Sequence, residues 1–154
     1  MTLHDKYEAA PRRAYEGAVT DLGDGGTDLR VALLDINHEP NLTGHAAWSD
    51  VSADEITNTA SNDTGYAAGG MALSTVTWAS DGTGVTQLSA GEITWETSTI
   101  DAGYAVVYDN TPATASDKTL LTLVDFEGEE SSEDGDFTID WDAVNGIFQI
   151  NTSP

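Results

Sequence analysis

Carboxylates are the most abundant side chains in this sequence that could do chemistry, because they bind hard cations. The densest acidic run is Glu127–Asp136, in which acids flank two glycines. Ca²⁺ takes several carboxylate and carbonyl oxygens around a sharp glycine turn, but the spacing here does not follow that of a calcium-binding loop. Asp21, Asp24 and Asp28 form a similar, weaker group. We therefore expect residues 127–136 to form a solvated hairpin, and we predict no specific metal or cofactor.

Histidines and nucleophiles form no catalytic pattern. His38 and His45 are seven residues apart with Glu39 between them, which is no recognised zinc spacing. The sequence has no Gly-x-Ser-x-Gly elbow to position a nucleophile. A glycosidase pair could be drawn from almost any two of the carboxylates, so that pattern has no weight. We therefore predict that the protein is not an enzyme.

The segment Gly65–Gly70 has a glycine spacing superficially similar to that of a phosphate-binding loop. It lacks the Gly-Lys-Ser/Thr ending, and no helix is predicted after it. We expect the glycines to permit positive φ angles or a tight bend before a strand.

Four tryptophans are the strongest candidates for contacts with other molecules, since exposed Trp often marks sugar or protein binding. Trp78, Trp95 and Trp141 each end a strand-like segment, which favours a place in the core or in a subunit interface. Trp48 lies in a long polar stretch and is the better candidate for an external contact.

The charge balance indicates the environment. The chain has 27 acidic against 5 basic residues and a net charge of −22, so self-repulsion should destabilise its compact state in dilute buffer. Molar salt removes that cost, because the Debye length falls to about 3 Å. The scarcity of Lys with abundant Asp and Thr favours a protein of a salt-loving archaeal host or its virus. Nucleic acid is not an expected partner, since phosphate binding needs Lys and Arg.

Residues 1–19 differ from the rest because they hold Lys6, Arg12 and Arg13, three of the five basic residues. We predict a short arm that ends near residue 10 and a helix from Pro11 to Val19, with the proline in the first turn. Acidic neighbours would attract this end and repel the remainder. We therefore expect these residues to dock on a partner subunit.

Residues 20–154 are predicted to form one domain of short strands. Leu29–Leu34 is almost entirely apolar and should be covered on both faces, whereas the polar stretch 35–63 should wrap the surface. Regular short strands with polar turns and no intervening helices indicate an all-β fold, an antiparallel β-sandwich of jelly-roll or Ig-like type. The other predicted strands are 71–78, 85–88, 93–95, 104–109, 120–126, 136–141 and 146–148.

Other classes are disfavoured by what the sequence lacks. No run approaches the about 20 apolar residues of a membrane span, and the N-terminus has no apolar signal-peptide core. We therefore expect no association with a membrane. We also expect the protein to be made and assembled inside a cell. With no cysteine, stability should come from the sheet core and from neighbouring subunits.

A series of short sequence motifs resembles a family of small virion structural proteins of tailed viruses, in a haloarchaeal version. The match covers about residues 14–148. The motifs are Thr64-Gly-Tyr-Ala-Ala-Gly-Gly70, the strand-like segment Trp95–Asp109, Leu120–Phe126, Ser131–Trp141 and Gly146-Ile-Phe148.

This resemblance implies a virion component that is assembled in the host cytoplasm and contacts other capsid or tail subunits, with a homo-oligomer as the default. A capsid-surface decoration or vertex protein is preferred, because a charge of −22 suits an outward face in salt. The alternative is a tail component or a receptor- or carbohydrate-binding module that uses Trp48.

The charge predicts that folding depends on salt. Lowering the ionic strength restores repulsion among the 27 carboxylates, so the melting temperature followed by circular dichroism should fall steadily from molar salt to dilute buffer. An unchanged melting temperature would remove the basis for a halophilic protein.

Overall fold

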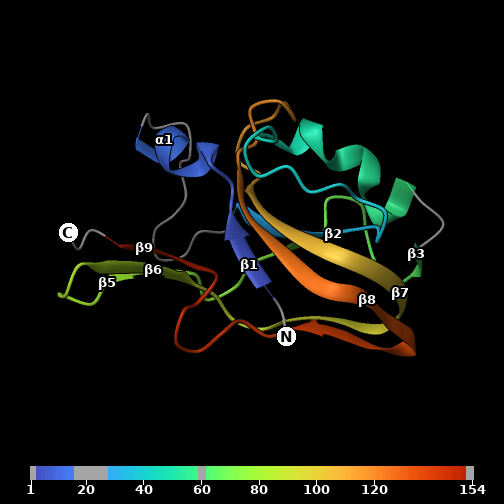
Figure 1. Ribbon diagram of the computed structural model, residues 1–154. Helices are drawn as coiled ribbons and strands as arrows, with labels where there is room; N and C mark the ends of the chain where they lie inside the picture. The colour runs from blue at the N-terminus through green and yellow to red at the C-terminus, as the bar shows by residue number, and fades with distance from the viewer. Residues whose placement is uncertain (1–2, 16–27, 59–61, 152–154) are drawn as a thin grey trace.

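Two antiparallel sheets pack together into a β-sandwich, which confirms the all-β prediction. The structure, a computed structural model, describes residues 3–15, 28–58 and 62–151 (Figure 1). The large sheet has the order β1-β8-β7-β2-β4, with β3 also paired to β7, and the small sheet has the order β5-β6-β9. The strands are β1 (Leu3–Lys6), β2 (Leu29–Leu34), β3 (Asn62–Thr64), β4 (Met71–Ala72), β5 (Thr77–Ser80), β6 (Val85–Ser89), β7 (Ile93–Asp109), β8 (Leu120–Ile139) and β9 (Phe148–Asn151).

The centre of the large sheet is apolar on both faces, as its sequence predicts. Every residue of β2 except Arg30 is fully buried. Val106 of β7 pairs with Ala32 on one side and with Leu123 on the other. Because neighbours in register share a face of a sheet, these side chains form one continuous layer that holds the central strands together.

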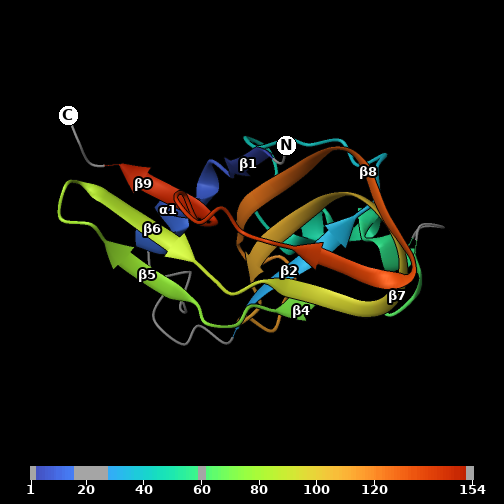
Figure 2. The same cartoon turned by 90° about the horizontal axis from the view of Figure 1, so that it is seen from below.

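Strands β7 and β8 are longer than expected. The short strands predicted at 93–95, 104–109, 120–126 and 136–141 merge into one hairpin, paired from Tyr108↔Leu120 to Ile93↔Ile139. Register shifts interrupt the pairing, and Thr97, Glu127 and Asp134 have positive φ angles of 49°, 60° and 49°. Such bulges bend a strand and increase its twist, and the hairpin curls back on itself (Figure 2).

The acidic run 127–136 is therefore not a loop between two strands, which corrects the expected hairpin. Its residues belong to β8, where Ser131 and Ser132 pair with Asp101 and Ile100 of β7. Its acidic side chains are exposed. Composition indicated a loop because the side chains are in water, yet the backbone at Glu130–Ser132 and at Gly135 pairs with β7.

The N-terminal segment belongs to the sandwich and is no free arm, a second correction. Strand β1 pairs antiparallel with β8, so residues 3–6 form an edge of the large sheet. Tyr7 and Ala10 are buried in the same core. Helix α1 (Ala9–Tyr15) contains Pro11 in its first turn, as predicted, where a missing N–H costs no helical bond. The predicted continuation to Val19 lies outside the described residues.

The polar stretch after β2 covers one side of the large sheet with three short 3-10 turns, η1 (Trp48–Asp50), η2 (Ser52–Asp54) and η3 (Ile56–Asn58) (Figure 1). It buries the side chains of Trp48, Val51 and Ile56. The ring of Trp48 stacks on Tyr108 with centroids 4.6 Å apart and an interplanar angle of 11°. The stretch thus supplies part of the core as well as surface.

The central strands should dominate stability. Leu121 and Leu123 are 1% and 3% exposed, so replacing either by Ala should cost about 2–5 kcal/mol of unfolding free energy. Asp134→Asn should cost less than about 0.5 kcal/mol, because Asp134 is exposed and Asn tolerates a positive φ equally well. Chemical denaturation in high salt measures both. A costlier Asp134→Asn would mean that the bend in β8 is an ordered ion site or interface.

Candidate functional site

The small sheet stands out because none of its residues is charged. Its strands read Thr-Trp-Ala-Ser, Val-Thr-Gln-Leu-Ser and Phe-Gln-Ile-Asn, in a chain with 27 acids. Figures 1 and 2 show this sheet at one end of the molecule and the bend of β7 and β8 at the other. A neutral surface on so acidic a protein is the place where another acidic protein would meet least repulsion.

One face of the small sheet is hollowed and partly apolar. The cross-strand pairs Ala79↔Gln87 and Gln87↔Gln149 place these side chains side by side on that face. The side-chain amides of Gln87 and Gln149 are 3.2 Å apart. The hollow is lined by Thr77, Ala79, Ser80, Asp81, Val85, Gln87, Ser89, Val144 and Gln149. Only Asp81, at the turn, carries a charge.

Val144 completes this face. Among the described residues it is the one large apolar side chain that is exposed, at 76%. The Asp142 carboxylate accepts hydrogen bonds from the backbone amides of Val144 (2.8 Å) and Asn145 (2.6 Å), which fixes a turn that presents the valine. The Val144 carbonyl lies 3.2 Å from the Gln149 amide nitrogen, so this turn is tied to β9.

The hairpin between β5 and β6 is held by its own aspartate. Asp81 accepts hydrogen bonds from the Thr83 hydroxyl (2.6 Å), the Thr83 amide (2.7 Å) and the Val85 amide (3.2 Å). These bonds, led by that of the Thr83 hydroxyl, hold the pKa of the Asp81 carboxyl below its usual range. The Asp81 carboxyl at the rim therefore stays ionised at neutral pH.

The other face of the small sheet fastens it to the core. Leu88 is fully buried, and Trp78 and Phe148 pack against the core with ring centroids 5.7 Å apart. The Ile147 amide donates to the Leu88 carbonyl (2.8 Å). The hollowed face is thus presented by a sheet whose reverse side is anchored.

The three basic residues predicted to form an interface have different surroundings. Lys6 donates to the backbone carbonyl of Gln149 (2.7 Å) and so lies beside β9. Arg13 donates to the Thr119 hydroxyl (3.1 Å), on the β8 side of the molecule. Arg12 is exposed on α1.

The expectation that Trp48 faces outward is wrong. Its side chain is 8% exposed and stacks on Tyr108. The long segment that contains it folds back over the sheet, which sequence spacing does not reveal. Trp95 and Trp141 are in the core and Trp78 is packed against it, as predicted.

The glycine segment before β4 has a structural role, as expected. Gly65, Gly69 and Gly70 have φ angles of 83°, 84° and 69°, and a side chain at Gly70 would collide with the Val31 carbonyl. The buried carboxylate of Glu55 accepts hydrogen bonds from the Tyr66 hydroxyl (2.8 Å) and the Gly69 amide (2.6 Å). These contacts hold the segment against the large sheet.

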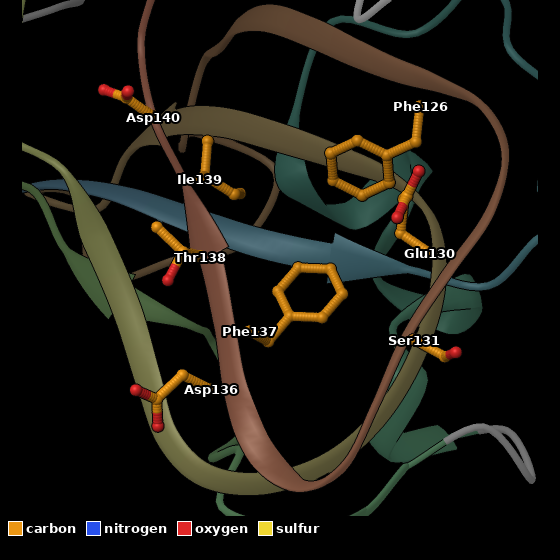
Figure 3. A pocket seen from close by; sticks show the side chains of 8 residues that line it. All are labelled: Phe126, Glu130, Ser131, Asp136, Phe137, Thr138, Ile139 and Asp140. Atoms are coloured by element: carbon orange, nitrogen blue, oxygen red, sulfur yellow. The ribbon is translucent and has the colours of Figure 1, made fainter.

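A second hollow lies inside the bend of β8 (Figure 3). Phe126 and Phe137 meet there edge to face, with centroids 6.0 Å apart. Three carboxylates, those of Glu130, Asp136 and Asp140, also line it. This charge would repel an acidic partner, so the hollow of the small sheet is the better contact surface.

Sequence reasoning missed Ala79, Val85 and Val144. The available signal was the absence of charge from residues 82–91 and from 143–154, which is unusual in so acidic a chain. The two uncharged segments form a single surface because β6 and β9 are neighbours in the small sheet, and this pairing is not visible in the sequence.

Within residues 3–15, 28–58 and 62–151, no group of three His, Asp or Glu side chains is placed to hold a metal ion by itself. No helix in the same ranges is long and apolar enough to cross a membrane.

In comparisons with known proteins, no family model, no curated protein and no solved structure matches the chain.

Proposed function

We propose that this protein is a structural component of a haloarchaeal tailed-virus particle and that it acts through protein contacts. Within such a particle, the role of a capsid-surface decoration or vertex subunit is preferred. The observation that carries the proposal is the uncharged, hollowed small sheet on a chain of net charge −22. The motif resemblance to small virion proteins of tailed viruses is the reason for proposing a tailed-virus particle.

Electrostatics explains why such a subunit would use this surface. Copies of the chain, or other acidic subunits, repel one another wherever carboxylates meet, and salt screens this repulsion without turning it into attraction. A contact through β5, β6 and β9 brings few charges together. It would also cover Val144 and the apolar part of the hollow lined by Ala79 and Val85.

An outward position on a capsid suits the remaining surface. The exposed middle of β8 carries Glu129, Glu130, Glu133 and Asp134, which are best left in water at high salt. A tail position remains the alternative. The carbohydrate-binding module loses its main support, since it rested on an exposed Trp48 and that ring is buried.

The direct test is to find the chain in particles. Virions purified in molar salt from a host that carries the gene should contain it in many copies by mass spectrometry, and cryo-electron microscopy should place it on the capsid exterior. If washed particles lack the chain, the proposal is wrong.

The contact surface can be tested by adding one charge. Ala79→Asp and Val144→Asp change exposed side chains, so the domain should stay folded while incorporation into virions falls at least severalfold. Ala113→Asp adds the same charge at an exposed residue outside the small sheet and should incorporate normally. Quantitative mass spectrometry compares the three. Equal incorporation of all would show that the small sheet is not the contact surface.

A further inference from the structure

Two imidazole nitrogens have no partner although both are buried. Among the described residues, His38 Nε2 and His45 Nδ1 are shielded from solvent and make no hydrogen bond. Buried polar atoms of native proteins almost always have a partner, so orphaned ones point to a bound water or ion. Here two of them belong to neighbouring rings.

His38 is held as metal-binding histidines usually are. Its Nδ1 lies 2.7 Å from Asp54 Oδ2, and its side chain is fully buried. A carboxylate accepts only, so Nδ1 carries the hydrogen, and in the neutral ring Nε2 is the nitrogen with the lone pair. Carboxylate–histidine pairs of this kind fix the tautomer and raise the basicity of the free nitrogen toward a metal. Tyr104 packs edge-on against the ring, with centroids 5.6 Å apart, and limits its rotation.

His45 lies at a suitable distance for a shared ion. The ring centroids of His38 and His45 are 5.7 Å apart and the rings are tilted by 40°. With Zn–N distances of about 2.0–2.1 Å, two imidazoles on one ion have centroids roughly 5–6 Å apart. The separation of the two rings is therefore that of two imidazoles bound to one ion.

The surroundings favour a cation. The hollow next to His45 is lined by Asn37, Glu39, Pro40, Asn41, His45, Asp50 and Asp54, among which three are carboxylates. Backbone hydrogen bonds, first that from Ala46 and then that from Ala47, hold the pKa of Asp50 below its usual range, and His45 lies close enough to lower it further. A negative, open hollow gives an ion a route to His45.

We propose that His38 and His45 bind one divalent transition-metal ion of the zinc type through Nε2 and Nδ1. Imidazole suits Zn²⁺, Co²⁺ and Ni²⁺ better than the hard cations Ca²⁺ and Mg²⁺. Among the residues that the structure describes, no third side chain is placed to complete the site, so the ion would keep water in its remaining positions. The ion would link His38 to His45, two residues of the stretch that follows β2 and covers the large sheet. This proposal does not depend on the virion function.

The test uses the full chain in molar NaCl after treatment with a chelator. Titration with Co²⁺ should give visible absorption that saturates at one ion per chain and is displaced by Zn²⁺. His45→Ala and Asp54→Asn should each weaken binding roughly tenfold or more, as removing a ligand or its orienting carboxylate does. His4→Ala removes the remaining histidine and should leave binding unchanged.

A measurement on the unaltered chain protects against variants that fail to fold. Zinc X-ray absorption should show two imidazole nitrogens in the first shell. A shell of oxygens alone, or equal binding by the native chain and by a folded His38→Gln/His45→Gln variant, would assign the ion to surface carboxylates and overturn the proposal. Absence of Co²⁺ binding at millimolar concentration would overturn it as well.

Discussion

Repulsion among carboxylates is the main constraint on where this fold can place its side chains, because the chain of 154 residues has 27 acids and only 5 bases. Most described acids lie in water, on turns and along the bent middle of β8. The buried exceptions have partners. Glu55 accepts from the Tyr66 hydroxyl and the Gly69 amide, and Asp109 accepts from the Thr111 amide. Burial of a carboxylate is tolerable where such donors replace water, so these acids fasten loops to the sheet.

The same constraint separates the two ends of the sandwich. At one end β7 and β8 bend through residues with positive φ and carry the acids outward. At the other end the small sheet is free of charge and is fixed to the core through Leu88. A subunit with one charged and one neutral end can face salt water with the first and a neighbour with the second. The proposed role in an assembly rests on this arrangement.

Some of this could be predicted from the sequence. The apolar run of β2 and the core residues Val106 and Leu123 follow from local pattern, because burial is the only role available to such side chains. The continuity of β8 could not, since its acidic middle reads as a loop and its pairing with β7 depends on bulges that composition does not mark. The stacking of Trp48 on Tyr108 and the pairing of β1 with β8 are long-range contacts, which spacing along the chain does not encode. The uncharged surface of the small sheet likewise appears only when distant strands are brought together.

Hydrogen–deuterium exchange can show whether this acidic chain contacts its neighbours through the small sheet, as we propose. Backbone amides would be compared between the free chain and the chain in purified particles, both in molar salt. We predict added protection in β5 (77–80), β6 (85–89), the 142–146 turn and β9 (148–151), with the acidic middle of β8 unchanged. Protection gained along residues 127–136 instead, with none in the small sheet, would contradict it.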